Sequence, residues 1–129
     1  MPLSVALVSP ERILYQGEAD MVVCRTTDGE IAFLTGHAPF LGALAIGKVK
    51  VVPPDGPPVR AAVHGGFVEV RDNRVSILSD VAELADQIDL ERARVARDAA
   101  ERLVQQGEDD EAAAALHRAT VRLEVGGEA

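Results

Sequence analysis

The residue types best suited to metal or nucleophilic chemistry are few and scattered along this sequence. The three histidines, His37, His64 and His117, form no His-x-His or His-x₃-His pair, and there is one cysteine. Zinc sites need several such ligands at short, regular spacings. Cys24 ends the apolar run 21–24, where a free thiol is typically a small buried apolar side chain. The sequence therefore favours neither a metal site nor a cysteine nucleophile.

Three arginines near the end of the sequence have a spacing that could bind an anion. Arg118 and Arg122 are four residues apart, so in a helix they share a face. If two helices fold back on each other, Arg92 can reach the same anion, and planar guanidinium groups suit phosphate oxygens. The same arginines also fit a solvated helix surface, with pairs such as Glu91 and Arg94. Taken alone, the pattern favours the solvated surface.

Two further segments interrupt strand-like patterns. The loop 35–39 places His37 between a glycine and a proline, which indicates a tight corner whose histidine hydrogen-bonds locally. Gly65-Gly66 lacks the Lys-Ser/Thr that follows a phosphate loop. Because strand-like segments flank it, we expect a bulge or a close backbone approach in a sheet.

The segment up to residue 87 has the features of a small all-β unit. Apolar residues alternate with polar or small ones at 3–7, 48–51, 59–63 and 74–77, and this period of two is typical of strands with one buried face. The run 53–58 predicts a hairpin tip, and Asp72-Asn73 predicts a two-residue turn with positive φ. Such closely spaced strands favour a sandwich or small barrel.

Residues 88–129 carry no proline, and they predict two antiparallel helices of about 15–17 residues. Asp89 and either Asp109 or Asp110 are the expected N-caps, and Gly107 and Gly126 are the expected stops. Apolar positions at helical spacing define the expected seam between the helices: Ala93, Ala96, Ala100 and Leu103 against Ala112, Leu116, Ala119 and Leu123. Alanines bury little area, so we expect the helix pair to be loosely held beside a stable sheet.

Composition narrows the function further. The chain has 129 residues and a net charge of −8, which argues against a nucleic-acid partner because phosphate affinity needs a basic surface. No run of about 18 apolar residues is present, so we expect no transmembrane segment, and the first residues lack the features of a signal peptide. A single cysteine gives no indication of an oxidising compartment.

Several motifs, in order along nearly the whole chain, resemble the epsilon subunit family of F-type ATP synthases of the bacterial and chloroplast type. They are Val8-Ser9-Pro10-Glu11, Gly29-Glu30, Gly36-His37-Ala38-Pro39-Phe40, Gly65-Gly66-Phe67-Val68-Glu69-Val70, and 75–80 running to Ala82-Glu83. The resemblance implies a ten-stranded antiparallel β-sandwich (residues 1–87) followed by a two-helix hairpin (residues 88–129).

The resemblance also implies a non-catalytic rotor subunit at the foot of the central stalk, on the cytoplasmic face of the inner membrane. The sandwich would bind the gamma subunit and the c-ring, with Glu30, Thr35, Gly36 and His37 at positions that face the c-ring. The hairpin would either fold against the sandwich or extend toward the alpha/beta catalytic head and block ATP hydrolysis. Rotation would then couple proton flow to ATP synthesis.

No cofactor is required in this family, but some members bind ATP as a regulatory ligand on the folded hairpin. Carried onto this sequence, their motif implies a site made of Glu83, Ile88, Asp89, Arg92, Ala93, Arg118 and Arg122. Ala99 stands where ATP-binding relatives have an arginine, and Arg97 is a differently facing substitute. The competing hypothesis is a stand-alone β-sandwich that binds a ligand in a deep pocket and dimerises through its helical tail.

Overall fold

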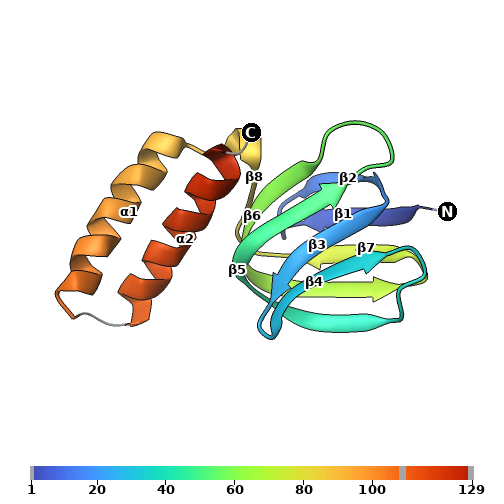
Figure 1. The fold of residues 1–129 in the computed structure, drawn as a ribbon, viewed down its shortest axis with the longest axis horizontal. Helices are drawn as coiled ribbons and strands as arrows, with labels where there is room; N and C mark the ends of the chain where they lie inside the picture. Colours follow the sequence, from blue (N-terminus) through green and yellow to red (C-terminus); the bar gives the residue numbers. More distant parts are fainter. Residues whose placement is uncertain (1, 108–109, 128–129) are drawn as a thin grey trace.

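The computed structural model describes residues 2–107 and 110–127 and places a β-sandwich beside an antiparallel helix pair (Figure 1). The strands are β1 (Leu3–Val8), β2 (Ile13–Ala19), β3 (Met21–Thr26), β4 (Gly29–Leu34), β5 (Phe40–Val52), β6 (Val59–Arg71), β7 (Arg74–Leu78) and β8 (Ala82–Leu84). A 3₁₀ turn, η1 (Ala85–Gln87), leads to the helices α1 (Leu90–Gln105) and α2 (Asp110–Gly127). The predicted fold class, β followed by α, is confirmed.

The period of two along the strands places their apolar residues in one core. Leu3, Val5 and Leu7 of β1 are fully buried, whereas Ser4 between them is exposed. Phe33 is the largest fully buried side chain of this core. The core thus lies inside the sandwich, between its two layers.

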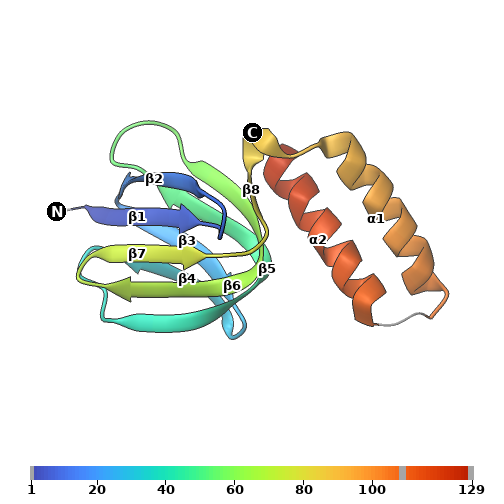
Figure 2. The same cartoon turned by 180° about the vertical axis from the view of Figure 1, so that it is seen from behind.

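The sheet runs in the order β2-β1-β7-β6-β5-β3-β4, with β8 paired to β6. β5 and β6 pair along almost their whole length and curve from one layer into the other (Figures 1 and 2). The expectation of ten strands was wrong, because these two 13-residue strands continue through their bends, and the described residues form eight strands. The sandwich is also not wholly antiparallel, since β1 pairs with β7 in parallel.

The predicted turns have the backbone that their residues favour. Asp72 and Asn73 have φ of 50° and 59° between β6 and β7, which confirms the two-residue turn. Residues 53–58 connect β5 to β6 as expected. The two glycines at 65 and 66 lie within β6 at positive φ, and a Cβ on Gly66 would come 2.0 Å from the carbonyl oxygen of Leu78. This confirms the predicted close backbone approach.

The described residues confirm two of the predicted helix ends and contradict one. Asp89 caps α1, with its side chain accepting from the backbone N–H of Arg92, and Gly107 follows α1 at φ 76°. Asp110 is the first helical residue of α2 rather than its N-cap, and Asp109, the other predicted N-cap, lies outside the described residues. Gly126 is not a stop, because α2 continues to Gly127. Instead, a Cβ there would lie 2.7 Å from Leu90 Cδ2, so the glycine permits close packing.

The seam between the helices is smaller than predicted. Ala93 and Ala100 of α1 are buried, and so are Ala112 and Ala119 of α2. Leu116 and Leu123 are partly buried, but Leu103 is 46% exposed and Ala96 is exposed as well. The prediction was therefore wrong for Ala96 and Leu103, and α1 buries only alanines among its residues.

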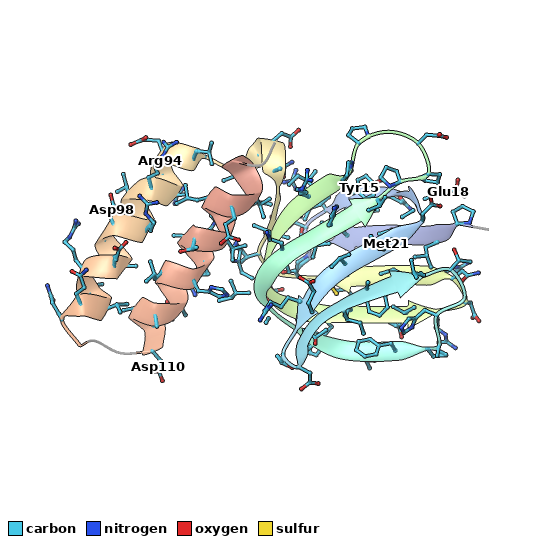
Figure 3. The ribbon with its side chains drawn as sticks, in the orientation of Figure 1. Tyr15, Glu18, Met21, Arg94, Asp98 and Asp110 are labelled. Carbon is cyan, nitrogen blue, oxygen red and sulfur yellow. The ribbon has the colours of Figure 1, made fainter. Side chains whose placement is uncertain are left out.

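α2 lies between α1 and the sandwich (Figures 1 and 2). In Figure 3, Arg94 and Asp98 project from α1 on the side away from the sandwich. Arg94 pairs with Glu91 at 2.9 Å, as predicted for a solvated helix surface. α2 and the sandwich meet at a small apolar cluster that we call the docking interface, formed by Ile46, Ala62, Ala85, Ile88, Val121 and Val125.

Three polar contacts surround the docking interface. The His117 ring donates from Nε2 to the carbonyl oxygen of Ile46 at 3.1 Å. Lys48 Nζ lies 3.6 Å from Glu124 Oε2, and Arg122 Nε donates to Glu83 Oε1 at 2.5 Å. Few buried side chains and mostly solvent-exposed ion pairs hold the helices in place, and exposed pairs contribute at most about 1 kcal/mol each.

No helix within the described residues is both long enough and apolar enough to cross a lipid bilayer.

Candidate functional site

A hollow of about 370 Å³ opens where the sandwich, η1 and both helices meet, and we call it the hairpin hollow. Its lining residues come from β8, η1, α1 and α2 and the short segment before α1. They are Glu83, Gln87, Asp89, Arg92, Ala93, Ala96 and Arg122.

Local structure fixes the polar residues of the hairpin hollow. Asp89 is held as the N-cap of α1, which places Arg92 on the first turn of that helix. Ala93 is buried and contributes only a methyl group to the lining of the hollow. Arg122 reaches from α2 to Glu83 of β8 and closes one side of the hollow.

The charges of the hairpin hollow are balanced. Two arginines, Arg92 and Arg122, face two carboxylates, Glu83 and Asp89. Arg122 already donates to Glu83, so a phosphate group entering the hollow would compete with that carboxylate. The arrangement can therefore bind a polyanion through guanidinium groups, and it contains no nucleophile or paired acid and base.

The structure brings together five of the seven residues that the resemblance implied: Glu83, Asp89, Arg92, Ala93 and Arg122. Ile88 lies instead in the docking interface and contacts the position of Gly126. Arg118 is one helical turn away and donates to Glu111 at 2.7 Å. Neither residue therefore lines the hairpin hollow, and a role for them in ATP binding stays a prediction. Binding of ATP by the other five remains a prediction.

Sequence reasoning missed Gln87 and Ala96, which also line the hollow. Gln87 accepts from the backbone N–H of Leu84 at 3.1 Å through its Oε1. The signal for Gln87 was its position three residues after the last strand, which is the spacing of a capping box. The sequence indicated Ala96 only as a residue of the seam between the two helices. Arg97 pairs with Asp98 at 3.3 Å and does not line the hollow.

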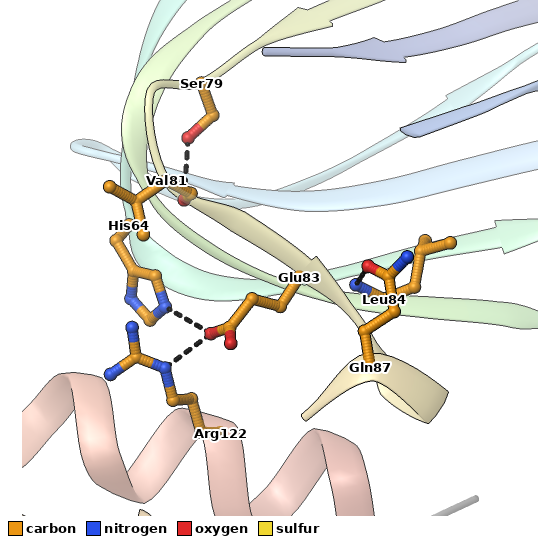
Figure 4. A network of polar contacts seen from close by, with 7 residues as sticks. All are labelled: His64, Ser79, Val81, Glu83, Leu84, Gln87 and Arg122. Atoms are coloured by element: carbon orange, nitrogen blue, oxygen red, sulfur yellow. Dashed lines mark hydrogen bonds and ion pairs between the residues drawn. The ribbon is translucent and has the colours of Figure 1, made fainter. Parts of the chain in front are cut away.

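Glu83 also faces a histidine on the sandwich side. Its Oε1 lies 3.8 Å from His64 Nε2, so one carboxylate is shared between His64 and Arg122 (Figure 4). Burial first, and then the positive charge of Arg122, lower the pKa of His64 from 6.5 to about 4, although Glu83 acts in the opposite direction. His64 is therefore neutral at pH 7.

The loop expected to face the c-ring, residues 35–39, connects β4 to β5 at the end of the sandwich away from the helices (Figures 1 and 2). The backbone N–H of Gly36 donates to Asn73 Oδ1 at 2.7 Å, which ties the loop to the β6–β7 turn. His37 bonds locally to Ala38 and packs edge-on against Phe33, with ring centroids 4.9 Å apart. Its local bonding agrees with the prediction of a tight corner.

Glu30 lies apart from that loop. It is the second residue of β4, whereas Thr35 follows its last residue, so the strand separates them by about 16 Å. Glu30 lines a second hollow with Lys48, Lys50 and Arg60 on the outer surface of β5 and β6. The structure thus places Glu30 away from Thr35, Gly36 and His37.

A groove of about 420 Å³ follows the junction of β6 and β7, and we call it the β6–β7 groove. It is lined by Val8, Ser9, Pro10, His64, Gly65, Gly66, Phe67, Leu78, Ser79 and Asp80. Phe67 is 57% exposed and Leu78 is 50% exposed, which is unusual for residues of this size. The groove therefore presents apolar surface to solvent.

The remaining chemistry-bearing residue is inert. Cys24 is fully buried, and desolvation raises the pKa of its thiol to about 11, so it is a thiol at neutral pH as the apolar run predicts. Within residues 2–107 and 110–127, no group of three His, Cys, Asp or Glu side chains is placed to hold a metal ion.

Comparison with known proteins identifies both parts of the chain. Residues 2–85 match the family described as ATP synthase, Delta/Epsilon chain, beta-sandwich domain. Residues 86–127 match the family described as ATP synthase, Delta/Epsilon chain, long alpha-helix domain.

Several proteins with similar sequences are named ATP synthase epsilon chain. An ATP synthase epsilon chain of Streptomyces griseus is 46% identical over 121 residues, covering 94% of this chain and 92% of the relative. That of Halalkalibacterium halodurans is 42% identical and covers 97% of both chains. A chain in a solved structure of Euglena gracilis mitochondrial ATP synthase aligns with TM-score 0.73 and 26% identity, covering 98% of this chain and 78% of that one.

Proposed function

The chain belongs to the delta/epsilon family of ATP synthase subunits as an epsilon chain, a non-catalytic subunit of the central stalk, and we propose that it couples the rotor to the c-ring and restrains ATP hydrolysis. The observation that carries this proposal is the match of two consecutive family domains to residues 2–85 and 86–127. Its partners are then the gamma subunit, the c-ring and the alpha/beta catalytic head. The site of action is the cytoplasmic face of the inner membrane.

Two surfaces of the sandwich support the coupling role. The exposed apolar side chains of the β6–β7 groove offer gamma an interface, because burying Phe67 and Leu78 would release apolar surface from water. The loop 35–39 supports a c-ring contact, since it lies at the free end of the sandwich (Figure 1) and its hydrogen bond to Asn73 ties it to the β6–β7 turn.

We expect Phe67→Glu to weaken co-purification with gamma by tenfold or more, because a carboxylate would replace an apolar anchor of the groove. Affinity pull-down of gamma, with the purified chain quantified, measures the effect. Val95→Glu is the matched control, since Val95 is 61% exposed on α1 and lies outside the groove. Equal binding by both variants would remove the groove from the interface. Failure of the unmodified chain to bind gamma would contradict the proposed function.

The restraint of hydrolysis is proposed to require a hairpin with two positions. The docking interface supports such a hairpin, because its fully or nearly buried members are only Ala62, Val121 and Val125. The buried residues that α1 contributes to the helix pair are both alanines. Little free energy therefore separates a docked hairpin from one extended toward the catalytic head. The hypothesis of a dimerising tail receives no support from the seam, whose alanines are buried within one chain.

We also propose that ATP binds the hairpin hollow and favours the docked hairpin, because the hollow joins residues from both parts of the chain. Arg92 and Arg122 would contact the phosphate groups, with Glu83 displaced from Arg122. The missing arginine at Ala99 leaves these two guanidinium groups as the cations lining the hollow.

The arginines provide a graded test of that site. We expect Arg92→Ala and Arg122→Ala each to weaken ATP binding by about 10- to 100-fold, which is the value of a lost charge-assisted contact. Arg118→Ala should change the affinity by less than about threefold, because Arg118 is paired with Glu111 outside the hollow. Isothermal titration of the full chain measures all three. No heat from the unmodified chain at millimolar ATP would end the nucleotide proposal and leave the stalk role intact.

A further inference from the structure

His64 lies at the junction of the sandwich and the hairpin, and its buried ring makes no hydrogen bond within the described residues. It lies on β6 opposite Ile46 of β5, and its side chain is only 3% exposed. Among the described residues, neither of its ring nitrogens has a hydrogen-bond partner. An unsatisfied buried imidazole costs free energy and requires an explanation. His64 lines the β6–β7 groove, but the function proposed above gives its ring no role.

The charges around His64 come from three sides. From β8, Glu83 approaches to 3.8 Å, which is too far for a hydrogen bond, and its Oε1 already accepts from Arg122. From α2, Arg122 and Arg118 both act against a positive charge on the ring. His117, also on α2, bonds to the carbonyl oxygen of Ile46, and Asp80 lines the same β6–β7 groove as His64. In this arrangement the docked hairpin brings Arg122 (Figure 4) and Arg118 toward His64, and Glu83 of β8 is the close counter-charge.

We propose that His64 is an acid-sensitive latch: its protonation releases α2 from the sandwich and so shifts the hairpin toward its extended position. This inference rests on the proposed two-position hairpin. Undocking removes Arg118 and Arg122, admits water to the ring and leaves Glu83 free to pair with the imidazolium. The protonated ring is thus better accommodated when the hairpin has left.

The direction of the pH dependence follows from linkage. The docked chain holds the pKa of His64 at about 4, against 6.5 for a free imidazole. Above pH 6.5 the ring is neutral in both positions, so docking is at full strength. As the pH falls from 6.5 toward 4, only the undocked chain takes up the proton, and docking weakens. The ratio of docked to undocked chain should fall about tenfold between pH 7.5 and 5.5.

Fluorescence energy transfer in the full chain, without nucleotide, tests the latch. Dyes at Asp55→Cys, in the β5–β6 turn, and Glu101→Cys, on α1, report the separation of the two parts. The native Cys24 does not compete for the dyes because it is fully buried. We expect transfer to change between pH 7.5 and 5.0 in the unmodified sequence, and in variants His37→Gln and His117→Gln, but not in His64→Gln. A response that survives in His64→Gln, or none in the unmodified sequence, overturns the proposal.

The NMR titration of the His64 ring provides a readout that does not depend on the folding of a His64 variant. We expect a pKa well below 6 in the unmodified chain and a rise of at least one unit in Arg122→Ala, because that change removes a cation and loosens α2. A pKa near 6.5 in both proteins would overturn the latch. Neither readout involves hydrolysis or ATP, so a failed latch leaves the inhibitory function standing. A hairpin that stays docked even in Val125→Glu would refute both.

Discussion

Gly66→Ala will remove a large part of the stability of the sandwich. The new Cβ would lie 2.0 Å from the carbonyl oxygen of Leu78 and 2.9 Å from the Cα of Ser79, and both atoms belong to the backbone and cannot rotate away. The residue also has φ 116°, which L side chains rarely adopt. We expect a loss of about 4 kcal/mol or more in the free energy of unfolding, against a total of about 5–15 kcal/mol for a domain. Urea denaturation of the full chain measures the loss, and gamma binding should fall with it.

Gly56→Ala separates the clash from the backbone strain. Gly56 has φ 99° in the β5–β6 turn, but nothing lies within 4 Å of a Cβ placed there. Its replacement should cost about 1–2 kcal/mol, the value of the unfavourable φ alone. Equal losses for the two variants would show that the approach of β6 to residues 78 and 79 is not the reason for the glycine.

Val125→Glu is expected to make the undocked hairpin the dominant form, while the sandwich stays folded. Val125 is fully buried in the docking interface with Ala62 and Val121. An unpaired carboxylate there costs about 3–5 kcal/mol, which exceeds what such a small interface contributes, so the hairpin leaves. We expect the docked population to fall by about 100-fold or more. Energy transfer between the dyes at 55 and 101 measures it, and ATP affinity should fall in parallel because the hairpin hollow is dismantled.

In a reconstituted complex the same variant should inhibit ATP hydrolysis more strongly at low ATP, since the extended hairpin is the proposed inhibitory form. Val95→Glu again serves as the control, because a charge on the exposed side of α1 should change stability by no more than about 0.5 kcal/mol. Loss of the whole fold in Val125→Glu, detected by urea denaturation, would mean that the hairpin and sandwich form one cooperative unit. The sandwich has an apolar core of its own that does not include the docking interface, which leads us to expect otherwise.

Local features of the sequence predicted much of the fold because they depend on neighbours a few residues away. The alternation of Leu3, Val5 and Leu7 defined a buried strand face, and Asp72-Asn73 adopted the turn that its residues favour. Asp89 capped α1 as its position indicated. The number of strands was not predictable from such local features. Whether β5 and β6 continue through their bends depends on their pairing along almost their whole length.

The candidate site was only partly predictable. Spacing placed Arg118 and Arg122 on one face of α2, but it did not determine which of them would reach Glu83. That choice depends on how far α2 slides along β6, and the packing of Val121 and Val125 against Ala62 sets this position. The same packing explains why Ile88 lies in the interface, and Gly126 continues the helix because it adjoins Ile88 and Leu90.

The sequence by itself determined the order of strands and helices, most of the turns and caps that punctuate them, and the motifs that identify the family. Each of these depends on backbone torsions or residue types within a short segment. Only the tertiary structure placed His64 between Glu83 and the arginines of α2. These residues are far apart along the chain, and the burial and charge that act on the imidazole arise only when the hairpin docks on the sandwich.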